Sequence, residues 1–231
     1  MEFNTAFFAD PASWEMIWIY ISKGFTFSIA LTLAATLGGI FFGTLIALMR
    51  LSSIKPLKWM ATIYVDVVRS IPLLMVLLWF FYFFKNFLDF LGINANFFNA
   101  NTAAIITFVA FEAAYFSEIV RAGINSVSRE QSSAGMALGM TYGQNMKLIV
   151  LPQAFRNMIP VFLTQVVILF QDTSLVYIMG ASDLFWAFDR IGRNSGVIVE
   201  MYILAAVAYF AICFTLSRII RFYQKRIAII R

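Results

Sequence analysis

The stretch GFTFSIALTLAATLGGIFFGTLIALM, residues 24–49, decides the fold class. It contains 26 residues without a charged side chain and is bounded by Lys23 and Arg50. Roughly 20 predominantly apolar residues in a helix suffice to cross the hydrocarbon core of a bilayer. The stretch therefore predicts a membrane-spanning helix.

The composition extends this prediction to the whole chain. Of the 231 residues, 61% are hydrophobic and only 13% are charged, and the mean hydropathy is +0.83. A soluble core of this size could not bury all 26 Phe and five Trp side chains, so a soluble fold would expose a largely apolar surface. Soluble, coiled-coil and disordered classes are excluded. We expect an all-α, multi-pass membrane protein with a single transmembrane domain over residues 1–231.

Four further apolar stretches predict additional spans, at about residues 57–84, 102–120, 158–179 and 201–220. A polar loop with Asn94, Asn96, Asn99 and Asn101 separates the second stretch from the third. The second stretch is interrupted by Asp66 and by Arg69-Ser70-Ile71-Pro72. Either one long helix carries Arg69 deep into the membrane, or an interfacial helix ends near Ser70. We favour the second alternative, because Pro72 is then in the first turn of the spanning helix, where its missing N–H is harmless.

The Lys and Arg side chains divide unequally between the two sides of five spans. One side carries Arg50, Lys55, Lys58, Arg121, Arg129, Lys147, Arg156, Arg218, Arg221, Lys225, Arg226 and Arg231. The other side carries Lys23, Lys85, Arg190 and Arg193. Basic residues accumulate on cytoplasmic loops, so the distribution predicts an N-terminus outside the cell membrane and a cytoplasmic C-terminus. The net charge of +5 then reflects topology and needs no nucleic-acid partner.

Missing residue types restrict the chemistry. The sequence contains no His, and its single cysteine, Cys213, lies in an apolar run. Disulfides, Cys/His metal sites and Ser-His-Asp triads are therefore excluded, and we expect no enzyme and no metal site. The first 22 residues contain three acidic residues but no Lys or Arg, so they lack the basic region of a signal peptide, and we expect a short exposed tail.

Small residues in the first span indicate a close helix contact. Gly39 and Gly43 have small-xxx-small spacing, which Ala35 extends. The contact could lie inside this subunit or at a subunit interface, and the sequence leaves both possibilities open. Five spans without an internal repeat are few for a self-sufficient transporter, which favours a partner subunit.

Residues 122–155 form one long cytoplasmic insertion between the third and fourth spans. Apolar stripes at helical spacing lie before and after Gly139: Ala134, Ala137 and Leu138, then Met146, Ile149 and Val150. The pattern predicts two short helices that break at Gly139 and end before Pro152. Gly135, Gly139 and Gly143 follow one another at four-residue spacing and leave a bare ridge suited to docking.

This insertion resembles the EAA loop of bacterial ABC-importer permeases. The resemblance is carried by Ser133-Ala134-Gly135, Gly139, Ile149 and Leu151-Pro152, with the family's spacing. The resemblance implies that the loop forms a coupling helix in a groove of a cytoplasmic ATPase. The sequence departs from the family pattern at Ser133, where Glu is usual, and at Gly135, where Ala is usual. The first departure puts a salt bridge at the coupling surface in doubt.

Further motifs resemble the polar amino-acid permeases along almost the whole chain. They include Arg69-Ser70-Ile71-Pro72-Leu73, Ser117-Glu118-Ile119, Leu151-Pro152-Gln153-Ala154-Phe155-Arg156 and the run Phe170 to Tyr177. The last run is most similar to one of the two permease subunits of bacterial glutamate/aspartate importers. The resemblance implies a type I ABC importer permease fold in the bacterial inner membrane, surrounded by membrane lipid. It also implies a second permease subunit, two ATPase subunits that bind ATP, and an extracytoplasmic binding protein, with no cofactor in this chain.

Polar side chains inside the hydrocarbon core of a membrane are energetically unfavourable and are usually kept for a function. Those of this chain are therefore candidates for substrate contact. The candidates are Gln165, Gln171, Asp172, Thr173 and Ser174 on the fourth span, together with Arg69. Gln165 and Asp172 lie seven residues apart and so share a helix face. These side chains could instead bond only to neighbouring helices. We expect Arg190 and Arg193 to meet the binding protein, and Glu112 and Glu118 to be structural partners of Arg121 and nearby backbone.

The sequence therefore predicts the permease subunit of an ATP-driven importer for acidic amino acids. One alternative is a permease for glutamine or a cationic amino acid. An alternative of a different class is an ion-coupled carrier with a proton relay through Glu112, Glu118 and Asp172. ATP hydrolysis requires another chain, because the sequence contains no G-x-x-x-x-G-K-[ST] motif.

Overall fold

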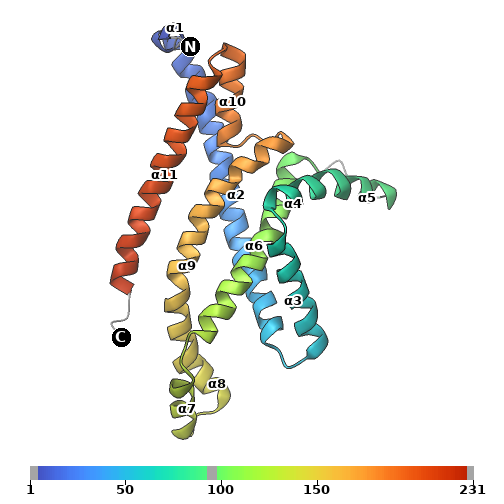
Figure 1. Ribbon diagram of the computed structural model, residues 1–231, viewed down its shortest axis with the longest axis vertical. Helices are drawn as coiled ribbons and strands as arrows, with labels where there is room; N and C mark the ends of the chain where they lie inside the picture. The colour runs from blue at the N-terminus through green and yellow to red at the C-terminus, as the bar shows by residue number, and fades with distance from the viewer. Residues whose placement is uncertain (1–4, 93–97, 228–231) are drawn as a thin grey trace. The chain divides into compact units, whose positions relative to one another are not determined.

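The computed structural model describes residues 5–92 and 98–227, and within these ranges the chain is almost entirely helical and contains no strand (Figure 1). The all-α fold class is therefore confirmed. The elements are α1 (Thr5–Ala9), α2 (Pro11–Leu51), α3 (Lys55–Ser70), α4 (Leu73–Trp79), η1 (Phe80–Phe84), α5 (Lys85–Phe90), α6 (Ala100–Asn125), α7 (Arg129–Ala137), α8 (Tyr142–Asn145), η2 (Met146–Val150), α9 (Leu151–Asp172), η3 (Thr173–Met179), α10 (Leu184–Ser195) and α11 (Ile198–Ile227). Asn94 and Asn96 of the expected polar loop, and Arg231 of the basic side, lie outside the described residues.

Five helical segments of the described residues are long and apolar enough to cross a membrane: Pro11–Leu51, Leu73–Phe90, Ala100–Asn125, Tyr142–Met179 and Ile198–Gln224. The first begins before the predicted boundary because no helix breaker follows Pro11. The expectation of an exposed tail is wrong from this point on, since residues 11–22 are helical and the Ser13 and Ile17 side chains are buried. The fourth begins earlier than predicted because α8, η2 and α9 follow one another without a break.

The chain breaks between α3 and α4, as the second alternative for Pro72 predicts. Helix α3 ends at Ser70 and α4 begins at Leu73, with Ile71 and Pro72 in extended conformations. However, α3 differs from the predicted interfacial helix, because it contacts more than the end of a spanning helix. The Tyr64 hydroxyl donates a hydrogen bond of 2.5 Å to the carbonyl oxygen of Ala110, which lies near the middle of α6. Helix α3 therefore packs beside a spanning helix and reaches the middle of that helix.

The chain forms two compact units, which we describe separately. The first comprises residues 1–35, 72–108 and 167–216, and the second comprises residues 36–71, 109–166 and 217–231. In the second unit, Ala47, Val120, Ala154 and Met158 form a buried cluster that joins α2, α6 and α9. In the first unit, Phe80 and Phe84 stack at 4.5 Å against a cluster that contains Leu88.

Gly39 and Gly43 make close helix contacts inside the second unit. A Cβ atom at Gly43 would lie 2.8 Å from the carbonyl oxygen of Ala113 and 2.8 Å from Cβ of Phe116. A Cβ atom at Gly39 would lie 2.7 Å from the Phe116 ring. The small-xxx-small pair therefore lets α6 approach α2 within this subunit, which decides between the two possibilities that the sequence left open for these glycines.

The insertion between the third and fourth spans forms the two short helices that the stripes predict. Helix α7 ends at Ala137, α8 begins at Tyr142, and Gly139 lies between them with a φ of +83° (Figure 1). Residues with a Cβ atom rarely adopt this backbone conformation, so glycine is favoured at the turn. Thr141 and Gln144 form a capping box that fixes the first turn of α8.

Candidate functional site

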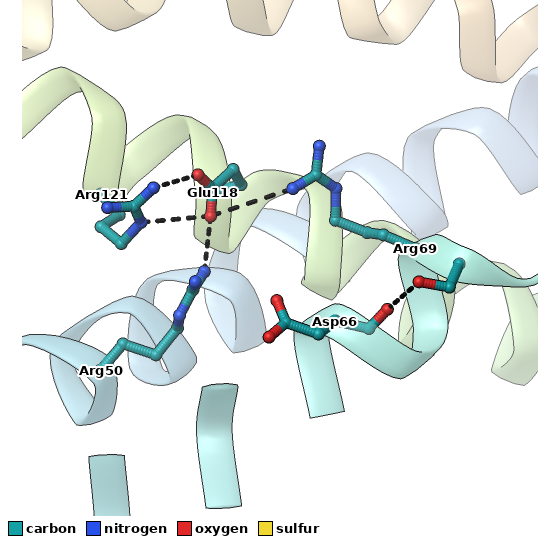
Figure 2. A network of polar contacts seen from close by, with 6 residues as sticks. Arg50, Asp66, Arg69, Glu118 and Arg121 are labelled. Atoms are coloured by element: carbon teal, nitrogen blue, oxygen red, sulfur yellow. Dashed lines mark hydrogen bonds and ion pairs between the residues drawn. The ribbon is translucent and has the colours of Figure 1, made fainter. Parts of the chain in front are cut away.

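A cluster of charged side chains in the second unit is centred on Glu118 of α6 (Figure 2). Arg50 near the end of α2 places Nη1 2.6 Å from Oε2 of Glu118. Arg121 binds the same carboxylate through Nη2 to Oε1 and through Nε to Oε2, the latter at 3.2 Å. The expected pairing of Glu118 with Arg121 is confirmed. Arg50 is a partner that the sequence did not reveal, because 68 residues separate it from Glu118.

Arg69 lies at the edge of this cluster and is held more weakly. Its Nη1 atom is 4.0 Å from Oε2 of Glu118, which is beyond hydrogen-bonding distance, and its side chain is 41% exposed. The guanidinium lies 5.3 Å from the centre of the Tyr115 ring. Its ion pair is therefore to Glu118 of α6 and not to Asp66 of its own helix (Figure 2).

Gln165 of α9 is paired with Glu112 of α6. Its Nε2 atom donates hydrogen bonds of 3.1 Å and 3.2 Å to the two carboxylate oxygens of Glu112, whose side chain is buried. An ionised carboxylate can only accept hydrogen bonds, so the Gln165 amide nitrogen must be the donor. Oε1 of Gln165 then remains as a hydrogen-bond acceptor. Glu112 thus orients Gln165, whereas the sequence pointed to Arg121 and nearby backbone as its partners.

The other span-four candidates lie where α9 passes into η3, in the first unit. Thr173 is fully buried and donates to the carbonyl oxygen of Phe170, so its hydroxyl is engaged locally. Ser174 donates in the same way to Gln171, whose own side chain interacts with the Cys213 thiol. Asp172 is half-buried, and its carboxylate accepts no hydrogen bond from the described residues. Asp172 is therefore the member of this group best suited to bind a cation.

The helical hairpin of α7, α8 and η2 holds the predicted coupling residues. Ser133, Ala134, Gly139, Leu151 and Pro152 are exposed, whereas Gly135 is buried and Ile149 is half-buried. The hairpin is fastened by Asn145, which is 2% exposed and donates to the carbonyl oxygen and hydroxyl of Ser132 at 2.9 Å and 2.8 Å.

Gly135 lies directly against this fastening. A Cβ atom there would be 2.6 Å from Oδ1 of Asn145 and 2.5 Å from Cδ1 of Ile149. A methyl group at position 135, as in the family's Ala, would therefore displace the ends of the Asn145 and Ile149 side chains.

Helix α10 carries the two arginines that were expected to meet a binding protein. Arg193 places Nε 2.8 Å and 2.9 Å from the carboxylate oxygens of Asp189, which also accepts a hydrogen bond of 2.6 Å from Tyr202. Burial alone would raise the pKa of Asp189, but the hydrogen bonds from Arg193 and Tyr202 outweigh it and hold this pKa below its usual value. Arg190 is exposed and bonds to no described residue. Arg190 is thus the more available of the two cations.

Asp183 caps the start of α10 and is fully buried. Its carboxylate accepts the backbone N–H groups of Phe185 and Trp186 at 2.8 Å and 3.1 Å. Burial raises the pKa of Asp183 to about 7, although these hydrogen bonds favour the ionised form. The next residue donates its backbone N–H to Ser28 of α2 at 3.0 Å, which fastens α10 to the first helix.

A cavity of about 380 Å³ lies beside Glu118 in the second unit. Its walls are mostly apolar and are formed by Glu118, Ile119, Ala122, Gly123, Ser126, Asn157, Met158 and Val161. Ser126 and Asn157 bond to one another at 2.8 Å. The cavity therefore offers few polar groups to an amino acid.

Comparison with known proteins places these features in a family. Residues 39–229 match the family of binding-protein-dependent transport system inner membrane components. The chain is 48% identical over 210 residues to the glutamate/aspartate import permease protein GltK of Escherichia coli O6:H1, which covers 90% of this chain and 94% of the relative. It is 35% identical to the L-cystine transport system permease protein TcyB of Bacillus subtilis (strain 168), over 93% of this chain and 91% of the relative.

A solved structure supports the same assignment. The crystal structure of an amino acid ABC transporter with histidines superposes with a TM-score of 0.85 at 32% identity, over 94% of this chain and 98% of the other. The predicted resemblance and the type I importer fold are confirmed. The chain belongs to the inner membrane components of binding-protein-dependent transport systems, as a permease subunit of an amino-acid ABC importer.

Proposed function

We propose that this chain is one of two homologous permease subunits of an ATP-driven importer that carries glutamate and aspartate into the cytoplasm. The observation that carries the proposal is the 48% identity to GltK over 90% of the chain. The substrate named for TcyB, at 35% identity, is cystine, so substrates differ among members of the family. The higher identity to GltK favours an acidic amino acid.

In this proposal the N-terminus is periplasmic and the C-terminus cytoplasmic, in the bacterial inner membrane. The distribution of Lys and Arg supports this orientation, since twelve of these residues lie on the side of Arg50 and the insertion, against four on the other. The α7–α8 hairpin is then cytoplasmic, and the helix that carries Arg190 is periplasmic.

Two cytoplasmic ATPase subunits bind and hydrolyse the ATP, and the hairpin receives their motion. Exposed apolar side chains at its tip support this role, because Leu138 is 81% and Tyr142 74% exposed. Such side chains at the tip of a helical hairpin favour a protein contact. Ser133 lies in this contact with the ATPase but lacks the carboxylate usual at this position, so the contact is mainly apolar.

The substrate meets groups that the fold leaves open. The carboxylate of Asp172 is suited to the ammonium group, and Oε1 of Gln165 is a further acceptor. Gln171, Thr173 and Ser174 shape the surroundings of Asp172. Arg69 is suited to a carboxylate, and Arg190 to the acidic surface of a loaded binding protein.

The contacts argue against a proton relay. Two guanidinium groups hold Glu118, and the Gln165 amide holds Glu112, so neither carboxylate is placed to exchange protons freely. We therefore assign the driving force to ATP.

Uptake by the complex of both permeases, the ATPase and the binding protein, reconstituted in liposomes, tests the proposal. Radiolabelled aspartate should enter only with ATP inside, and glutamate but not glutamine or arginine should compete. Asp172→Ala should abolish uptake and leave assembly intact, whereas Asp89→Ala, an exposed carboxylate of α5, should have no effect. Competition by glutamine or arginine but not by glutamate would refute the acidic substrate, and uptake without ATP would refute the mechanism.

A further inference from the structure

Helix α3 presents a polar face of which the proposed function uses only Arg69. Polar side chains recur along it at three- and four-residue spacing: Lys55, Lys58, Thr62, Asp66 and Arg69. This spacing places them on one side of the helix. All five are exposed or half-exposed, and they border Ala61 and Val65, which are buried. The polar face therefore lies at the edge of the packed interior of the second unit.

The position of α3 restricts what this face can meet. The hydrogen bond from Tyr64 to Ala110 places the middle of α3 beside the middle of a spanning helix. Charged side chains at such depth do not face lipid, but a protein partner or a water-filled cavity. Met60, Ile63 and Val67 form a separate exposed apolar strip on the same helix, and this strip suits lipid. The two exposed strips thus meet different surroundings.

Arg69 is presented as an open anion-binding group at the end of the polar face. The oxygens of Glu118 already accept hydrogen bonds from Arg50 and Arg121, and Arg69 donates none to the described residues. The Tyr115 ring supports one side of its guanidinium. A guanidinium with free donors matches a carboxylate in bidentate geometry.

We propose that the polar face of α3 lines a water-filled stretch of the translocation path, and that Arg69 there receives the side-chain carboxylate of the passing amino acid. The inference rests on the proposed function for the identity of the substrate. Lys55, Lys58 and Arg69 outnumber the single Asp66, so the face attracts anions. A path for acidic amino acids benefits from such a field, because it raises the local concentration of substrate.

Cysteine labelling tests the water-filled face without reference to the substrate. Cys213 is the only cysteine in the sequence, so Cys213→Ala gives a background without thiols. Thr62→Cys places a thiol on the polar face, and Ile63→Cys, its neighbour on the apolar strip, is the matched control. The assembled complex in membrane vesicles is treated with sulfonatoethyl methanethiosulfonate, an anion, and with the trimethylammonium-ethyl reagent, a cation.

We expect Thr62→Cys to react about tenfold faster than Ile63→Cys, with the anionic reagent faster than the cationic one. Excess aspartate should slow labelling, and Arg69→Gln should reduce the preference for the anion, because only Lys55 and Lys58 then oppose Asp66. Arg69→Lys should keep that preference, because the charge remains, but should raise the KM for aspartate uptake because the bidentate contact is lost. Size-exclusion chromatography verifies that each complex is assembled.

Equal labelling of the two thiols in a complex that imports would overturn the inference. So would a preference for the anion that Arg69→Gln leaves undiminished, since Arg69 would then not contribute to binding the anion. Uptake measured on the same vesicles separates this inference from the proposed function. Import of glutamine without competition by aspartate contradicts the acidic substrate and with it the role of Arg69, whereas the two labelling rates alone decide whether the face meets water.

Discussion

Replacing Glu118 by Gln should destabilise the second unit much more than replacing Arg69. The exchange removes the charge that faces Arg50, whose side chain is only 10% exposed and whose Nη1 atom lies 2.6 Å from the carboxylate. Leaving one member of a buried ion pair without its partner typically costs about 3–5 kcal/mol. Glu118 is 23% exposed and Arg121 is 36% exposed, so we expect a value near the lower end, about 3 kcal/mol.

The two partner arginines provide graded controls. Arg50→Gln leaves Glu118 bound to Arg121, so it should cost about 1.5–3 kcal/mol, the range for hydrogen bonds to charged groups. Arg69→Gln should cost less than about 1 kcal/mol, because this 4.0 Å pair is 41% exposed at the guanidinium. The double variant Glu118→Gln with Arg50→Gln should lose less than the sum of the single variants, since no buried guanidinium of Arg50 then remains unpaired.

The free energies of unfolding are measured by titrating the purified subunit in mixed micelles with dodecyl sulfate and following helix content by circular dichroism. The expected order of destabilisation is Glu118→Gln, then Arg50→Gln, then Arg69→Gln. A cost below about 1 kcal/mol for Glu118→Gln, or one equal to that of Arg69→Gln, would refute the argument that Glu118 ties α2 to α6. Strictly additive losses in the double variant would also contradict it.

Three further outcomes follow from local geometry. Gly43→Val should cost about 1–3 kcal/mol by overpacking the contact of α2 with α6, whereas Gly143→Ala, where a Cβ atom meets nothing within 4 Å, should be neutral in the same titration. Gly135→Ala should lower the ratio of uptake to ATP hydrolysis in the reconstituted complex by displacing Asn145, and an unchanged ratio would count against a coupling role for the hairpin. The pKa of Asp183 rises from 3.8 to about 7 on folding, so the folded state binds its proton more tightly than the unfolded state. The contribution of Asp183 to the free energy of unfolding is therefore fully present below pH 3.8 and is lost as the pH rises to about 7. Asp183→Asn keeps one of the two capping hydrogen bonds and removes the titrating group, so it should remove this fall in stability with pH, and an unchanged pH profile would refute the effect of burial.

Features that depend on neighbouring residues in the chain could be predicted from the sequence. The predicted apolar stretches overlap all five helices long enough to span a membrane, Pro72 located the break after α3, and Gly139 located the turn between α7 and α8. The pairing of Glu118 with Arg121 was accessible because the two residues are three apart on a helix. Each of these conclusions rests on helical periodicity or on the restricted backbone of Pro and Gly.

Contacts between distant segments could not be predicted, because periodicity assigns a residue to a helix face without naming what lies opposite. The bond between Gln165 and Glu112 joins residues 53 apart, and that between Leu184 and Ser28 joins residues 156 apart. The length of α2 was also missed, because the first span was identified by its uncharged run, which begins after Lys23.

The distinction between paired and open polar groups separates scaffold from transport machinery in this chain. A polar group at membrane depth is tolerated when another side chain compensates it, as with Glu112 and Glu118, or when water or substrate does so. Asp172 accepts no side-chain hydrogen bond from the described residues, and the Arg69 guanidinium donates none to them. Changes at the paired groups should therefore reduce stability and assembly, and changes at Asp172 and Arg69 should reduce transport in complexes that still assemble. A variant of Asp172 that failed to assemble would place this residue in the scaffold, and the ammonium of the substrate would then need another acceptor.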